Sequence, residues 1–96
     1  MNTMIEVEKT SAGGKTEFQV TVSEGAGKTT HRVSMSPLTY KKLSKGAVSE
    51  ERLVQAAFEF LLDREPKESI LRSFDLTVIS RYFPEFERLL GGYLTR

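Results

Sequence analysis

The stretch EFQVTVSEGAGKTTHRVSM, residues 17–35, decides the fold. Apolar and polar residues alternate on both sides of the short segment EGAGK. Alternation with a period of two is typical of a strand with one buried face, and a short Gly-rich segment between two such runs is typical of a hairpin turn. We therefore expect strands over about residues 16–23 and 29–35, joined by a turn in which Gly25 and Gly27 have positive φ.

The same pattern extends toward the N-terminus, where Ile5 and Val7 alternate with Glu6 and Glu8. A second Gly-rich segment, SAGGK, separates this run from the central stretch. We expect a third strand over about residues 4–9, so that the first third of the chain forms a three-stranded antiparallel meander.

After Met35 the hydrophobic period changes from that of a strand to that of a helix. Ser36 and Ser49 are candidate N-caps, and they predict helices over about residues 37–44, ending near Gly46, and over about residues 49–64. The second of these helices is apolar around well over half of its circumference, so it should be central.

The remaining chain is divided by Pro66, Asp75 and Pro84. Proline ends or starts a helix, and Asp is a good N-cap, so these residues predict several short helices. Gly91 and Gly92 should interrupt the last of them. The expected short helices cover about residues 67–73, 76–83 and 84–90.

A run of strands followed by a run of helices predicts the α+β class. We expect one domain over residues 1–96: a three-stranded antiparallel β-meander, then a long central helix and several short helices packed on one face. The expected core contains Val20, Val22, Val33, Leu53, Ala57, Phe58, Leu61, Ile70, Leu71, Val78 and Ile79.

The composition argues against several classes of site. The chain has no cysteine and one histidine, which excludes thiolate chemistry and makes a zinc site improbable. No apolar run approaches the roughly 18 residues of a membrane span, and no signal peptide is apparent. We expect a cytoplasmic protein with no metal, no cofactor and no membrane contact.

The letters Gly27-Lys28-Thr29 match the end of a Walker A phosphate loop. The first glycine of that motif would fall on residue 22, which is valine, and a strand pattern follows Thr29 where the motif needs a helix. This segment is therefore a hairpin turn. His31 alternates with Arg32 and should sit at the edge of the core, so we expect neither catalytic residues nor an enzyme.

Aromatic residues are dense near the C-terminus, at Phe74, Tyr82, Phe83 and Phe86. They form either part of the core or an exposed apolar groove for a partner. Tyr82 and Tyr93 are amphipathic and lie near helix ends, so they are the best candidates for the rim of such a groove. The first functional hypothesis is accordingly a non-enzymatic module that binds another protein through this surface or through an edge of the sheet.

The segment HRVSMSPLTYKKLSKGAVSEERLVQAAFEFLLDRE, residues 31–65, resembles a ribbon-helix-helix unit. That resemblance implies two chains that pair their strands and place polar strand residues in the DNA major groove. Lysines of the first helix would contact phosphate. The second functional hypothesis is thus a DNA-binding regulator or antitoxin. The residues that match are Thr30, Arg32 and Ser34 on the strand, and Lys41, Lys42 and Lys45 after it.

Charge is unevenly distributed, since residues 26–46 hold five bases and no acid. This block favours an anionic partner. However, Glu6, Glu8 and Glu17 share the polar face of the expected sheet, and the second strand already pairs with residues 29–35. We therefore rank the protein-binding hypothesis first, and the sequence leaves the oligomeric state and the partner open.

The C-terminal segment EPKESILRSFDLTVISRYFPEFE, residues 65–87, is similar to a small family of bacterial proteins of unassigned function. The similarity extends back through residues 17–37. It implies a bacterial origin and a free-standing domain. It implies no activity and no site residues.

Overall fold

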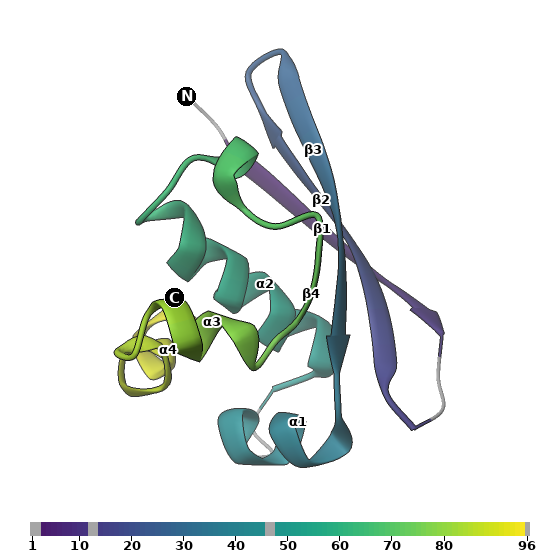
Figure 1. Ribbon diagram of the computed structural model, residues 1–96, viewed down its shortest axis with the longest axis vertical. Helices are drawn as coiled ribbons and strands as arrows, with labels where there is room; N and C mark the ends of the chain where they lie inside the picture. The colour runs from purple at the N-terminus through teal and green to yellow at the C-terminus, as the bar shows by residue number, and fades with distance from the viewer. Residues whose placement is uncertain (1–2, 12–13, 46–47, 96) are drawn as a thin grey trace.

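The computed structural model describes residues 3–11, 14–45 and 48–95. A sheet and a layer of helices pack face to face, which confirms the α+β class (Figure 1). The elements are β1 (Thr3–Ser11), β2 (Thr16–Glu24), β3 (Gly27–Met35), α1 (Pro37–Ser44), α2 (Glu50–Leu62), the 3-10 turn η1 (Lys67–Ser69), β4 (Ser73–Asp75), α3 (Val78–Tyr82) and α4 (Phe86–Leu94).

The sheet has the strand order β1-β2-β3-β4, and β1 to β3 form the expected antiparallel meander. The helices cover one face of the sheet and leave the other face open (Figure 1). This arrangement follows from the period-two pattern, since Val20, Val22 and Val33 are fully buried while Gln19 and Arg32 are exposed.

The hairpin between β2 and β3 is a two-residue turn, because Glu24 pairs with Gly27. Gly25 has a φ of 60°, as expected, and the pattern of one positive φ at the first central position is that of a type II′ turn. The expectation of positive φ at Gly27 is wrong. Gly27 is part of β3, and a Cβ built there would lie 3.2 Å from Nζ of Lys67, the end of a long side chain.

The two helices predicted from the N-cap candidates Ser36 and Ser49 are both present in the structure. Ser36 caps α1 by accepting from the Thr39 amide at 3.2 Å, and Ser49 caps α2 by accepting from the Arg52 amide at 3.1 Å. Helix α2 is shorter than expected and ends at Leu62. The predicted end near Gly46 lies outside the described residues, and Lys45 closes α1 in the left-handed conformation with φ 52°.

The predicted helix over residues 67–73 is wrong, and the sheet has a fourth strand instead of three strands. β4 pairs in parallel with β3. The Arg32 amide donates to the Arg72 carbonyl at 2.8 Å, and the Leu76 amide donates to the Ser34 carbonyl at 2.9 Å. These bonds to the edge of β3 replace the local bonds of a helix, so tertiary pairing overrides the local pattern.

Asp75 fastens β4 to the sheet through its side chain. Its Oδ1 accepts from Ser34 Oγ at 2.7 Å and from Lys15 Nζ at 3.2 Å, and its Oδ2 accepts from the hydroxyl and amide of Thr77. Burial alone would raise the pKa of this carboxyl, but the hydrogen bonds outweigh burial and lower the pKa to about 2. Asp75 therefore stays charged and holds the start of α3 beside β4.

Helix α3 is shorter than expected at both ends, and α4 begins and ends later than expected. α3 covers only Val78–Tyr82, and α4 continues through Gly91 and Gly92, which lie on its exposed side. Leu90 and Phe86, on the opposite side of α4, are buried. Packing of this apolar face compensates for the low helix propensity of the two glycines.

Most of the expected core is confirmed, but Leu71 is 47% exposed and Val78 is only half-buried. Phe58 and Phe60 show why α2 is central. The Phe58 ring faces the sheet side at 5.3 Å from the His31 ring, while the Phe60 ring contacts Phe86 at 5.0 Å. Among residues 3–11, 14–45 and 48–95, no helix is long and apolar enough to cross a membrane.

Candidate functional site

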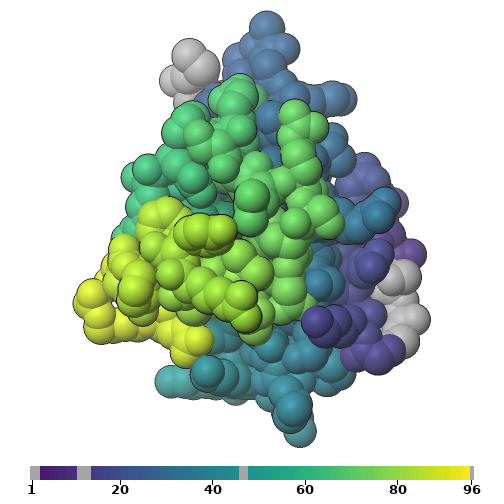
Figure 2. Space-filling view, viewed as in Figure 1, coloured from purple at the N-terminus to yellow at the C-terminus, as the bar shows by residue number. Residues whose placement is uncertain are grey.

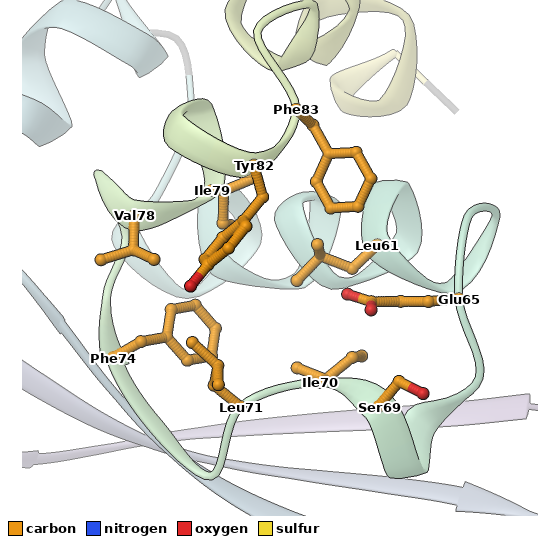
Figure 3. Close-up of a pocket in the computed structure, with 10 residues that line it drawn as sticks. All are labelled: Leu61, Glu65, Ser69, Ile70, Leu71, Phe74, Val78, Ile79, Tyr82 and Phe83. Atoms are coloured by element: carbon orange, nitrogen blue, oxygen red, sulfur yellow. The ribbon is translucent and has the colours of Figure 1, made fainter.

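An apolar groove of about 240 Å³ lies between the C-terminal end of α2, the segment that leads from η1 into β4, and α3 (Figure 3). It belongs to the C-terminal half of the chain, which forms the front of the molecule in Figure 2. The lining side chains are mostly aliphatic or aromatic. They are Leu61, Ile70, Leu71, Phe74, Val78, Ile79, Tyr82 and Phe83. Glu65 and Ser69 complete the lining.

The groove lies where the segment that leads into β4 runs past the C-terminal end of α2. Backbone bonds bind residues 72–76 to β3, and α3 then follows on the side of the sheet that the helices cover (Figure 1). Ile70 is buried against the core, whereas its neighbour Leu71 points outward. The space between β4, α3 and the end of α2 is therefore lined by apolar side chains but is not filled by them.

Two large side chains at this groove are exposed to solvent. Tyr82 is 67% exposed and Leu71 is 47% exposed. In Figure 3 the Tyr82 ring lies over Phe74 and Leu71. Among the described residues, the other exposed large hydrophobic side chains are Met4 on β1 and Leu38 on α1, and neither is part of this groove. Leu71 and Tyr82 are thus the two of these side chains that have a cavity beside them.

Glu65 lies in the turn that follows α2, and its side chain extends toward the groove beside Leu61 (Figure 3). Its carboxylate makes no hydrogen bond or ion pair with any residue that the structure describes. Burial raises the pKa of this carboxyl. The groove therefore combines apolar walls with one unpaired acidic side chain.

The sequence predicted Tyr82, which lines the groove, but it did not predict Glu65 and it placed Leu71 in the core. Glu65 lies beyond the end of α2 and of the helix expected from the sequence, and its amide donates to the carbonyl of the core residue Leu61 at 2.9 Å. No local signal was available for Leu71. Its exposure depends on the β3–β4 pairing, which the local sequence does not indicate.

Tyr93 does not belong to the groove, so the structure separates the two candidate tyrosines. The Tyr93 ring packs on Phe60 at 5.7 Å, its hydroxyl donates to Asp63, and its carbonyl accepts from Arg52 Nη2 at 2.7 Å. Arg64 adds a further contact, with its guanidinium 3.7 Å from the Phe60 ring centroid. Tyr93 thus fastens α4 to α2.

The candidate DNA-contacting residues are divided between two regions. Arg32 lies on the open face of the sheet, in a polar hollow of about 570 Å³ that Thr30 and Arg72 also line. Ser34 donates to Asp75. Lys41, Lys42 and Lys45 lie on or just after α1, and Lys42 pairs with Glu87 at 3.3 Å.

β3 has β2 on one side and β4 on the other, so neither edge of residues 32–34 is open to a second chain.

His31 is a structural residue of the sheet–helix interface, and it is 1% exposed. Its Nδ1 lies 2.8 Å from the Leu71 carbonyl and its Nε2 lies 2.8 Å from the Thr29 hydroxyl. A neutral ring that carries its proton on Nδ1 satisfies both partners, donating to the carbonyl and accepting from the hydroxyl. Within the described residues, no group of three or more His, Cys, Asp or Glu could hold a metal ion.

The groove is therefore the feature best suited to a ligand: it is concave, largely apolar and rimmed by exposed side chains. Comparison of the chain with protein-family models, with curated proteins and with solved structures gives no match.

Proposed function

We propose that the protein is a small interaction module whose groove receives an apolar side chain from a partner protein. The observation that carries this proposal is the exposure of Leu71 and Tyr82 at the mouth of a cavity of about 240 Å³. An exposed apolar site with a hollow in it is typical of a surface that another molecule covers.

The size of the groove limits what it can hold. An apolar cavity of roughly 150 Å³ is large enough for benzene. The groove is therefore suited to a single leucine-sized or aromatic side chain from an otherwise surface-bound segment. Burial of such a side chain stabilises a complex by about 1.5–3 kcal/mol, which corresponds to roughly 10- to 150-fold in affinity.

Replacement of Leu71 by glutamine is expected to weaken partner binding by about tenfold, because one wall of the groove loses its apolar surface. The matched control is Leu38→Gln, since Leu38 is 79% exposed on α1 and lies outside the groove. Peptides selected from a random display library on the wild-type protein would be titrated against both variants by calorimetry. Equal affinity for the wild type and Leu71→Gln would contradict the proposal.

DNA binding is the second candidate function. The observation in its favour is that Arg32, Lys41 and Lys45 are exposed and make no ion pair with any residue in the described part of the chain. The pairing of β3 on both sides makes the two-chain ribbon of this class of protein unfavourable, because β4 would have to leave the sheet first.

The two functions differ in their salt dependence. If all five bases of residues 26–46 contacted phosphate, affinity for duplex DNA would fall roughly 500-fold between 50 and 200 mM salt. If the protein is an interaction module, we expect no salt-dependent binding to duplex DNA. We also expect a monomer by light scattering over a dilution series. A dimer whose DNA affinity follows that salt dependence, and falls further in Arg32→Ala, would reverse the ranking.

A further inference from the structure

Glu65 gives the groove a chemical preference as well as a shape. Its carboxylate is directed into the groove (Figure 3), and no donor or cation among the described residues contacts it. The neighbouring base, Arg64, is not a partner for Glu65, because it pairs with Glu85 at 3.3 Å and lies over the Phe60 ring. The acid is therefore available to whatever enters the groove.

Filling the groove changes the surroundings of this carboxylate. An apolar group that enters would displace the water that remains around Glu65. An unpaired charge without water is unfavourable, and the cost disappears if the entering molecule supplies a cation or a donor. A negative charge on the ligand would add repulsion at close range. The same apolar group should thus bind with different affinity according to the charge that it carries.

We infer that the occupant of the groove is a partner segment in which an apolar side chain is accompanied by a lysine, an arginine or another cation that pairs with Glu65. This inference rests on the proposed function, since it names the chemistry of the segment that the groove receives. The charge complementarity comes from Glu65 alone, because the lining of the groove holds no other Asp or Glu and no Lys or Arg.

Three small probes that share one aromatic group test the inference. They are phenethylammonium, phenethyl alcohol and 3-phenylpropionate, which carry a positive, a zero and a negative charge at neutral pH. Each would be titrated into ¹⁵N-labelled protein, and binding would be followed through the amide shifts of Ile70, Val78 and Phe83. We expect phenethylammonium to bind about 5- to 10-fold more tightly than the alcohol, and phenylpropionate to bind most weakly.

The variant Glu65→Gln should remove this preference, because a neutral amide neither attracts the cation nor repels the carboxylate. Glu8→Gln is the matched control, because Glu8 is an exposed acid on β1, away from the groove, and its loss changes the net charge equally. The preference should survive in that control. The shift dispersion of both variants shows whether each is folded.

Each outcome bears on a different claim. Equal affinity of the cation and the alcohol for the wild type would overturn the inference, as would a preference that persists in Glu65→Gln, and the proposed function would stand. Absence of groove shifts with all three probes would mean that the groove does not take apolar groups. In that case the proposed function fails, and the inference fails with it.

Discussion

Replacement of Phe60 by alanine is expected to lower the free energy of unfolding by about 3–5 kcal/mol. Phe60 is fully buried in α2, and its ring contacts Phe86 at 5.0 Å, Tyr93 at 5.7 Å and Phe83 at 5.8 Å. The substitution removes the apolar contact that holds α4 and the end of α3 to α2. Total stabilities of domains this size are about 5–15 kcal/mol, so the loss would be a large fraction.

Urea denaturation followed by far-ultraviolet circular dichroism measures this change. Leu38→Ala is the control, because that side chain is exposed and should contribute within about 0.5 kcal/mol. A loss below about 1.5 kcal/mol in Phe60→Ala would show that α4 does not depend on this aromatic cluster. The arrangement of Phe83 above the groove would then need another explanation.

Replacement of His31 by alanine is expected to destabilise the fold by about 2–4 kcal/mol. The variant loses the ring contact with Phe58 and leaves the Thr29 hydroxyl and the Leu71 carbonyl without their partner, each at a cost of about 1–3 kcal/mol if they stay dry. Because the carbonyl belongs to Leu71, His31 also positions the rim of the groove. Altered amide shifts around Leu71 in the folded variant would accompany the loss of stability.

His31 also makes a specific prediction about pH. Burial lowers the pKa of this imidazole below its ordinary value of 6.5, and the hydrogen bond to Leu71 only partly opposes the change. The folded protein therefore binds fewer protons than the unfolded chain just below pH 6.5, so stability is complete above that pH and declines as the pH falls. His31→Ala should show a flatter profile there, whereas Arg32→Ala should keep the decline. A wild-type profile that is flat between about pH 6.5 and 5 would contradict the assignment.

The sequence predicted the parts of the fold that depend on local signals. The alternation in residues 17–35 predicts β2 and β3, and Ser36 and Ser49 predict the starts of α1 and α2. Each of these signals acts through neighbouring residues of the chain. They survive because the tertiary structure requires the same conformation that the local pattern favours.

The segment after Pro66 shows where local signals are insufficient. Residues 67–73 can form a helix, but the edge of β3 offers hydrogen bonds to Arg72 and Leu76 that a helix cannot make. The groove results from that pairing, so its walls could not be predicted from the sequence even though Tyr82 was identified. Tyr93 shows the converse, since an aromatic residue near a helix end is as well suited to packing on Phe60 as to binding a partner.

The claim that the groove is the binding surface can be tested most directly by mapping a bound peptide. ¹⁵N–¹H correlation spectra would be recorded on the wild-type protein with and without a peptide selected from a display library. The proposed function predicts the largest shifts at Ile70, Leu71, Val78 and Phe83. Shifts that run along β1 or across the open face around Arg32, with the groove unchanged, would contradict it.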